Sequence, residues 1–272
     1  MSEYFRHSST TYYSLIASLP LLLGYEILVT LTQSPFWGVR NAADVWIRTF
    51  MMAFDIRPQY IFFVMILIVI GMIPVIKVKG SAPPLKGSIF LVMFLEALAY
   101  SMVLGIVLHF MVRLVLLSAG GFAGNALQNI ALSLGAGLFE EFFFRVLLLN
   151  VLFWGLKFIL RTTLLTGLVA ILTASLLFSL SHYIGNMADT FQWYSFIFRW
   201  MAGLLFTLLY FFRGFAITAY THALYDIQPC VIAAETFISS FEFVASLVSC
   251  FMEQVVHLCQ SSLGTVGSIR DL

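Results

Sequence analysis

Residues 60–76 read YIFFVMILIVIGMIPVI, a run with no charged residue and an apolar side chain at nearly every position. A helix needs about 20 mostly apolar residues to cross the hydrocarbon of a membrane. Similar runs lie near 12–32, 88–118, 130–156, 163–182, 194–212, 215–228 and 229–252. The sequence therefore predicts an all-α fold, a polytopic transmembrane bundle of seven or eight helices.

The composition excludes several classes of protein. Of the 272 residues, 61% are apolar and 10% are charged, whereas soluble domains carry about 25% charged residues. So few charges cannot cover a water-exposed surface, which excludes a soluble enzyme and a disordered chain. A net charge of +1 without a basic block excludes a nucleic-acid partner. The three cysteines have neither the number nor the spacing of a disulfide framework or a zinc knuckle: Cys230, Cys250 and Cys259.

Loop charges and an amphipathic segment predict how the chain meets the bilayer. Residues 44–54 have the pattern of an amphipathic helix at the interface, with Trp37 and Trp46 at headgroup depth. Basic residues favour the cytoplasmic side of a membrane. An N-terminus in the cytoplasm leaves only Arg40, Arg48 and Arg57 in the outside segments. It collects the other basic residues of the loops on the inside: Arg6, Lys77, Lys79, Lys86, Lys157, Arg161, Arg213 and, with eight helices, Arg270. We therefore expect a cytoplasmic N-terminus.

Ionisable residues inside the fourth apolar run are the first functional signal. This run contains Phe139-Glu-Glu-Phe-Phe-Phe-Arg145, and a charge in hydrocarbon must face protein or a watered cavity. Glu141 and Arg145 are spaced i,i+4, so they share a helix face and can form an ion pair. Glu140 points to another face, and a desolvated carboxylate without a cation suits a general base. The alternative is a structural ion network of Glu140, Glu141 and Arg145 that joins helices.

Two histidine motifs follow on later helices. Phe178 and His182 are spaced i,i+4, and so are His222 and Asp226. A single histidine on an apolar helix is usually a hydrogen-bonded core residue. Here two histidines and several carboxylates lie on three separate helices, and such sets converge in the core of a helix bundle, where sites are built.

These motifs, in this order, resemble those of the CPBP family. They read Glu-Glu-x-x-x-Arg, then Phe-x-x-x-His, then His-x-x-x-Asp. The family comprises the CAAX-processing and bacteriocin-processing (Abi) intramembrane endopeptidases, which are related to the type II prenyl-protein protease. The resemblance divides the chain into N-terminal membrane helices (1–125), a CAAX-protease-like core (126–252) and a C-terminal tail (253–272).

Carried over position by position, the resemblance implies a role for each motif residue. Glu140 and His182 would activate water, while His222 and Asp226 would stabilise the oxyanion or hold that water. The supporting residues would shape the site: Glu141, Arg145 and Phe178. Two positions depart from the family, in which Asn is more usual than Asp226 and many members have Gly where this chain has Val146. Because an ionised Asp cannot donate a hydrogen bond, Asp226 is either protonated or orients His222.

The resemblance implies an enzyme without a metal or another cofactor. A zinc variant is the alternative, with Glu140, His182 and His222 as ligands and an open position for water. The sequence contains no HExxH pair.

Three functional interpretations follow. The first is an intramembrane endopeptidase of the bacterial inner membrane that cleaves a membrane-associated protein or peptide. The second is a catalytically inactive immunity or scaffold protein of the same fold. The third is a transporter or proton relay lined by further polar residues: Glu26, Glu96, His109, Arg113, Arg199, Glu235 and Glu242. The sequence lacks the paired broken helices of inverted-repeat transporters. For these residues we favour a structural role, either as side chains that snorkel at helix ends or as ion pairs between helices.

Overall fold

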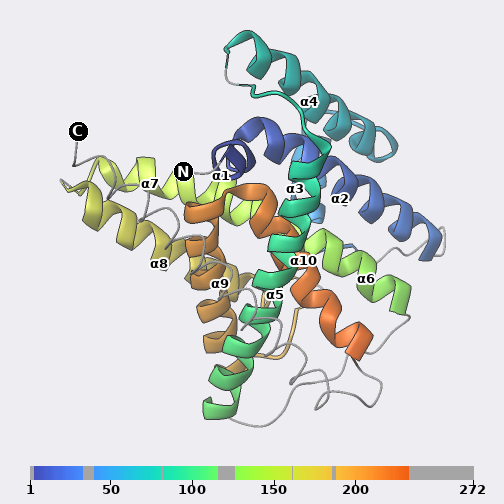
Figure 1. The fold of residues 1–272 in the computed structure, drawn as a ribbon. Coiled ribbons are helices and arrows are strands. Elements are labelled where there is room, and N and C mark those ends of the chain that lie inside the picture. Colours follow the sequence, from blue (N-terminus) through green and yellow to red (C-terminus); the bar gives the residue numbers. More distant parts are fainter. Residues whose placement is uncertain are drawn as a thin grey trace, which may run out of the picture. The chain divides into compact units, whose positions relative to one another are not determined.

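The computed structural model describes residues 3–32, 40–80, 82–115, 126–160, 162–185 and 188–232. Within these ranges the secondary structure is helical, with turns and short connections but no strand, as Figure 1 shows. The predicted all-α fold is therefore confirmed. Several predictions concern parts of the chain that lie outside the described residues. These are the helix beyond Ile232, the tail 253–272, Trp37, and the side chains of His109, Arg113, Glu235, Glu242 and the three cysteines.

The N-terminal part is built from five helices. They are α1 (Glu3–Ser8), α2 (Thr11–Thr32), α3 (Ala42–Met52), α4 (Pro58–Val78) and α5 (Gly87–Val115). The predicted runs 12–32, 60–76 and 88–118 correspond closely to α2, α4 and α5. Prolines lie inside both α2 and α4, as membrane helices tolerate.

The fourth apolar run forms one continuous helical stretch with an unusual centre. It comprises α6 (Ala126–Gly135), the π-helical turns η1 (Ala136–Glu140) and η2 (Phe142–Leu148), and α7 (Leu149–Lys157). A π-helix is wider than an α-helix and occurs frequently at functional sites. The sequence predicts an ordinary α-helix here, so the π geometry around Glu140 and Glu141 is a correction.

Three more helices complete the described chain: α8 (Thr163–Ser181), α9 (Trp193–Arg213) and α10 (Phe215–Ile232). The predicted helix boundary at Pro229 is wrong, because α10 continues through this proline. α10 lies between α5 and α6 (Figure 1), and Thr221 and Gln228 on α10 donate hydrogen bonds to α5.

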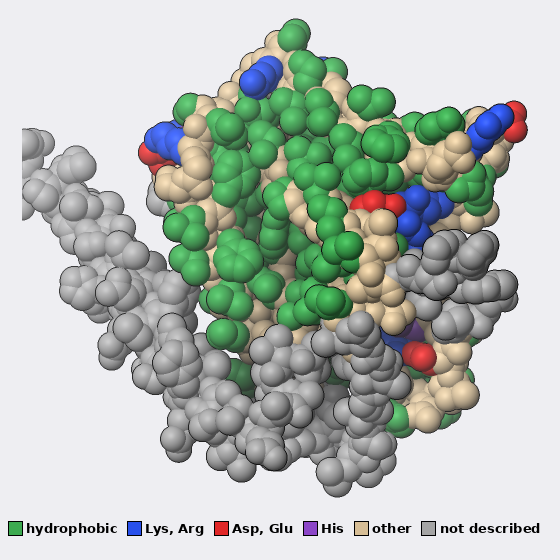
Figure 2. Space-filling view, turned by 90° about the vertical axis from the view of Figure 1, so that its right-hand side faces the viewer, with side chains coloured by type: hydrophobic (Ala, Val, Ile, Leu, Met, Phe, Trp, Pro, Cys, Tyr) green, Lys and Arg blue, Asp and Glu red, His purple; other side chains and the backbone are tan. Residues whose placement is uncertain are grey.

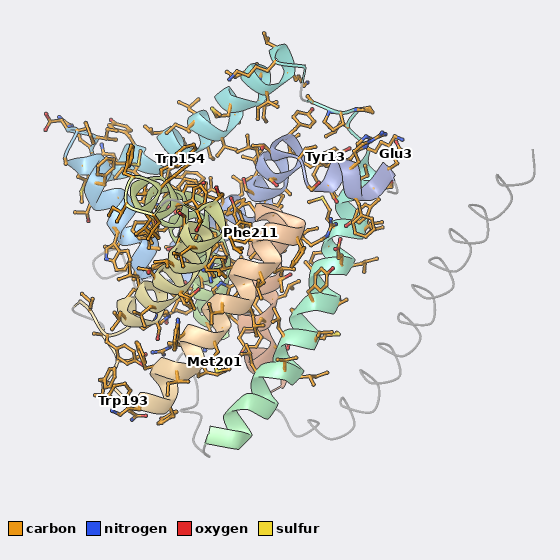
Figure 3. All side chains as sticks on the ribbon, turned by 90° about the vertical axis from the view of Figure 1, so that its left-hand side faces the viewer. Glu3, Tyr13, Trp154, Trp193, Met201 and Phe211 are labelled. Atoms are coloured by element: carbon orange, nitrogen blue, oxygen red, sulfur yellow. The ribbon has the colours of Figure 1, made fainter. Side chains whose placement is uncertain are left out.

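The surface of the described helices is that of an integral membrane protein. Five helices are long and apolar enough to cross a bilayer: α2, α4, α8, α9 and residues 87–108 of α5. Hydrophobic side chains spread over most of the face in Figure 2, and charged side chains form a few small groups there. Trp193 at the start of α9 is 70% exposed, and Phe211 lies near the opposite end of this helix (Figure 3). Exposed aromatic residues at helix ends are typical of membrane interfaces.

The amphipathic helix α3 turns its polar side inward. Asp44 is fully buried, whereas Phe50 and the following Phe54 are each 66% exposed. Trp46 packs its ring against Phe143 and Phe144. The predicted helix is present, with its charged residues toward the protein and its apolar residues divided between the protein (Trp46) and the outside (Phe50).

A polar cluster fastens α1 to the longer helices. Arg213 at the end of α9 donates hydrogen bonds to Glu96 on α5 (2.7 Å) and to Ser8 (2.9 Å), and Tyr4 donates to the same Glu96. This interhelical ion pair is the structural role that the sequence favours for Glu96.

Candidate active site

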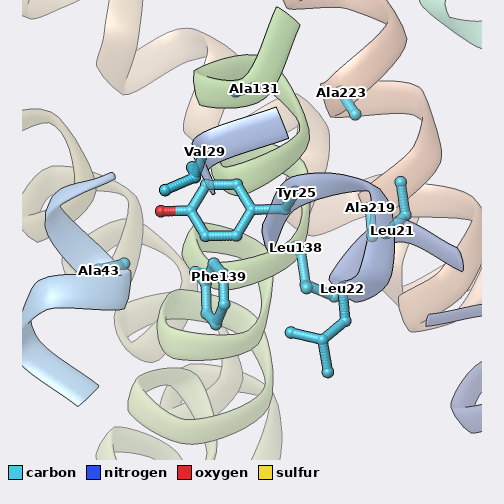
Figure 4. Close-up of a cluster of buried hydrophobic side chains, with 10 residues drawn as sticks. All are labelled: Leu21, Leu22, Tyr25, Val29, Ala43, Ala131, Leu138, Phe139, Ala219 and Ala223. Carbon is cyan, nitrogen blue, oxygen red and sulfur yellow. The ribbon is translucent and has the colours of Figure 1, made fainter. Parts of the chain in front are cut away.

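Small residues allow α10 to approach the π-helical segment closely. A Cβ added at Gly137 would lie 2.3 Å from the carbonyl oxygen of Ala219 and 2.7 Å from the Cβ of Ala223. Figure 4 shows Ala219 and Ala223 on the helix that faces Leu138. Since His222 lies between these two alanines in the sequence, the close approach brings its imidazole to the carboxylates that follow Gly137.

Glu141 and Arg145 form a buried ion pair, as the i,i+4 spacing predicts. Arg145 Nη1 lies 2.9 Å from Glu141 Oε1, and the two side chains are at most 1% exposed. The guanidinium also donates to the Gly203 carbonyl oxygen (3.3 Å) and lies over the rings of Phe178 (4.7 Å) and Phe206 (5.7 Å). Arg145 thereby connects the π-helical segment with α8 and α9, while Glu141 Oε2 and Arg145 Nε have no hydrogen-bond partner among the described residues.

His222 is held on both ring nitrogens and on one face. Its Nδ1 lies 2.6 Å from Glu141 Oε1, and its Nε2 lies 3.5 Å from Asp226 Oδ2. The ring of Phe206 stacks on the imidazole, with the centroids 4.4 Å apart. An ionised carboxylate only accepts hydrogen bonds, so contacts with Glu141 and Asp226 favour a protonated imidazole. The arrangement thus offers an N–H on the side of Asp226.

His182 ends α8 in a defined tautomer. Its Nδ1 lies 3.0 Å from the carbonyl oxygen of Phe178, and the two rings meet edge to face at 5.1 Å. A carbonyl oxygen can only accept, so Nδ1 carries the proton and a neutral His182 leaves Nε2 as an acceptor. The backbone N–H of Asp189 donates to the His182 carbonyl oxygen (3.0 Å), and the Asp189 side chain binds Arg199 at 2.6 Å.

Glu140 differs from its neighbour in both partner and exposure. It is partly accessible, whereas Glu141 is fully buried. Its Oε1 accepts a hydrogen bond of 2.7 Å from the side-chain amide of Asn41. Glu140 also lies close enough to His182 and His222 to interact electrostatically with both. Two adjacent carboxylates therefore have separate surroundings: Glu141 binds Arg145 and His222 in the core, whereas Glu140 binds the amide of Asn41 and stays partly accessible.

The structure brings the predicted site residues into one region of the bundle. Glu140, Glu141 and Arg145 come from the π-helical segment, Phe178 and His182 from the end of α8, and His222 and Asp226 from α10. In the described part of the chain, no group of three or more His, Cys, Asp and Glu side chains has the arrangement of a metal site.

Sequence reasoning misses two contributors to this region. Phe206 carries no charge, so an apolar helix gives no signal that it stacks on His222. Asn41 does carry a local signal, because an Asn directly before an amphipathic run is a typical helix N-cap. Its contact with Glu140, 99 positions away, has no sequence signature.

Comparison with known proteins finds a family model that is similar to the central part of the chain. Residues 122–228 match the family model described as Type II CAAX prenyl endopeptidase Rce1-like. The match contains every site residue that the motifs predict, and it confirms the resemblance to the CAAX-processing (CPBP) proteases. Over these residues the chain is similar to CAAX-type membrane proteases. No curated protein and no solved structure matches the chain.

Proposed function

We propose that this protein is an intramembrane endopeptidase that hydrolyses a peptide bond in a membrane-associated protein or peptide with water activated by Glu140 and His182. The observation that carries the proposal is the division between the two adjacent glutamates. Glu141 is committed to Arg145 and His222 in the core. Glu140 remains partly accessible and within electrostatic reach of the two imidazoles.

The reaction begins with removal of a proton from water. The Glu140 carboxylate accepts this proton, while Nε2 of His182 accepts the second hydrogen of the same water and orients it. The water oxygen attacks the scissile carbonyl carbon, and the carbonyl π electrons move onto oxygen. When the tetrahedral intermediate collapses, the C–N bond breaks and the proton on Glu140 passes to the departing nitrogen. The products are a new carboxyl terminus and a new amine, and no acyl-enzyme forms.

His222 supplies the charge that stabilises the oxyanion. Its Nε2–H lies on the side of Asp226 at a long 3.5 Å, a separation at which the N–H can be shared with a third group. Preorganised donors of this kind contribute about 3–4 kcal/mol to transition-state stabilisation. In this proposal Asp226 orients His222, which a carboxylate does without donating a hydrogen bond.

The substrate reaches the site within or beside the bilayer. The helices around the site are apolar on their outer faces, so a membrane-associated protein or peptide is the fitting partner class. We further propose a bacterial inner membrane with the N-terminus in the cytoplasm, based on the distribution of basic residues along the chain.

The test compares membranes that contain wild type with membranes that contain Glu140→Gln, at matched expression. Glu3→Gln is the matched control, because Glu3 lies on the exposed part of α1. Mass spectrometry of new protein termini should reveal cleavage products with wild type and Glu3→Gln that are absent with Glu140→Gln. Identical termini in all three membranes would show that the protein is not a Glu140-dependent protease, and would favour an immunity or scaffold role.

A second arm of the test addresses the zinc alternative. In the metal-free reaction, treatment with a chelator leaves the appearance of new termini unchanged. If these termini disappear after chelation and return with added zinc, Glu140 is a zinc ligand and does not activate water by itself.

A further inference from the structure

The N-terminal region reaches into the candidate active site through one side chain. Asn41 precedes α3, and its Nδ2 donates a hydrogen bond of 2.7 Å to Oε1 of Glu140. Both Asn41 and its helix lie outside residues 122–228, the segment that matches the protease family. The partner of Glu140 therefore comes from a part of the chain that the family match does not contain.

The orientation of the Asn41 amide is fixed by its second hydrogen bond. Oδ1 accepts from the backbone N–H of Ala43 at 2.9 Å, which makes Asn41 the N-cap of α3. A rotated amide would lose this cap and place an oxygen against the Glu140 carboxylate. Nδ2 consequently points to Glu140 as a donor.

A partly buried charge network holds the backbone of Asn41 in place. The hydroxyl of Tyr25 accepts from the Asn41 backbone N–H (3.2 Å) and donates to Asp44 (2.9 Å). Arg40 and Arg48 each bind both Asp44 and Glu26, at distances between 2.7 and 3.1 Å. Two arginines and two carboxylates balance, so the network is neutral and can be buried without an unpaired charge.

Tight packing fixes this network against the helix that carries Glu140. A Cβ at Gly135 would lie 2.5 Å from the Tyr25 ring and 3.1 Å from the Cβ of Asn41. Figure 4 shows the Tyr25 ring beside Phe139, with its hydroxyl directed toward the helix that carries Ala43. Tyr25 is fully buried, so the network has little freedom to move relative to Glu140.

We infer that Asn41 is a positioning residue for Glu140: its amide orients the carboxylate by binding Oε1, so that Oε2 faces the water. This inference rests on the proposed role of Glu140 as the base. Charged or titratable groups also interact electrostatically with Glu140: Arg145 on the same segment, His182 at the end of α8, and His222 and Asp226 on α10. Asn41 differs from these in contributing a neutral donor that holds one oxygen without a titratable proton.

The first test measures the contact without measuring catalysis. Asn41→Ser retains a hydroxyl cap for α3 but is too short to reach Glu140, and Glu140→Leu removes the acceptor. Thermal unfolding of the full chain in detergent compares both single variants with the double variant. We expect Asn41→Ser to lower the unfolding temperature less in the Glu140→Leu background than in wild type. Additive effects would overturn the inference.

The second test measures the pH dependence of cleavage. Loss of the donor disfavours the ionised carboxylate, so the acidic limb of the kcat/KM profile should move up by about one pH unit in Asn41→Ser. Asn41→Asp keeps the cap and adds a like charge, so its shift should be larger. We expect both variants to have a lower kcat than wild type and an unchanged KM. If both variants keep the wild-type acidic limb of the kcat/KM profile and differ only in the amount of folded protein, Asn41 serves only as the N-cap of α3. That result would overturn the inference.

Matched controls separate this inference from the proposed function. Asn150→Ser removes an exposed amide that donates to the Val146 carbonyl oxygen, and it should change neither the coupling nor the pH profile. Activity that survives in Glu140→Gln would contradict the proposed function. The thermal unfolding of the single and double variants would still report whether Asn41 binds Glu140. A failure of the proposed function can therefore be distinguished from a failure of this inference.

Discussion

Replacement of Gly137 by Ala should separate the two helices that carry the candidate active site. The added Cβ would lie 2.3 Å from the Ala219 carbonyl oxygen and 2.7 Å from the Ala223 backbone nitrogen. Both are backbone atoms, so no rotamer change can relieve the clash. Non-bonded heavy atoms need about 3.5 Å, and α10 would have to retreat by roughly 1 Å.

This retreat has a structural and a catalytic cost. Overpacking of a tight interface costs about 1–3 kcal/mol, and the better helix propensity of Ala returns at most about 1 kcal/mol. The same movement stretches the 2.6 Å contact between His222 and Glu141 beyond the range of a hydrogen bond, about 3.2 Å. We therefore expect both the unfolding free energy and the cleavage rate to fall.

The assay compares Gly137→Ala with Gly167→Ala in the interior of α8. A Cβ at Gly167 meets nothing within 4 Å, so this control isolates helix propensity. Unfolding in mixed micelles and the cleavage rate in liposomes are measured for both. Addition of Ala223→Gly should not rescue Gly137→Ala, because the Ala219 carbonyl remains in place. Equal stability and equal activity of the two alanine variants would refute the close approach of α10.

Three further substitutions test other parts of the structure. Arg145→Met should lower the unfolding free energy by about 3–5 kcal/mol, because it removes one of the two cationic partners of the fully buried Glu141. A denaturant titration that shows no loss would contradict this ion pair. Phe206→Leu nearly keeps the core volume and removes the ring stacked on His222; we expect less than about 1.5 kcal/mol of destabilisation with a clear fall in kcat, and the reverse pattern would count against a role for the ring. Arg213→Met breaks the cluster with Glu96 and Ser8, so the unfolding temperature should fall while the pH profile of cleavage stays that of wild type; a shifted profile would connect this cluster to the site.

The helices and the motif residues were predictable because their signals are local. Long apolar runs specify membrane helices, and i,i+4 spacing places Glu141 beside Arg145 and His222 beside Asp226. The small residues around Gly137 also indicate close helix packing. Each of these inferences needs only neighbouring positions in the chain.

The missing parts of the site depend on distant packing or on backbone geometry. No local pattern connects Asn41 with Glu140, because they meet only after α3 packs against the π-helical segment. The π geometry itself shifts side chains relative to an α-helix and has no simple sequence signature. Pro229 shows the opposite error, since α10 continues through a residue that is a local helix-breaking signal, as membrane helices tolerate.

The most direct test of water activation is the cleavage rate of purified protein in liposomes, with a processed substrate and Glu140→Gln beside Glu3→Gln. Loss of a general base lowers a rate by about 10²–10⁴-fold. We predict a loss of this size for Glu140→Gln at unchanged folding, and a wild-type rate for Glu3→Gln. A Glu140→Gln protein that cleaves at the wild-type rate would contradict the central role of Glu140.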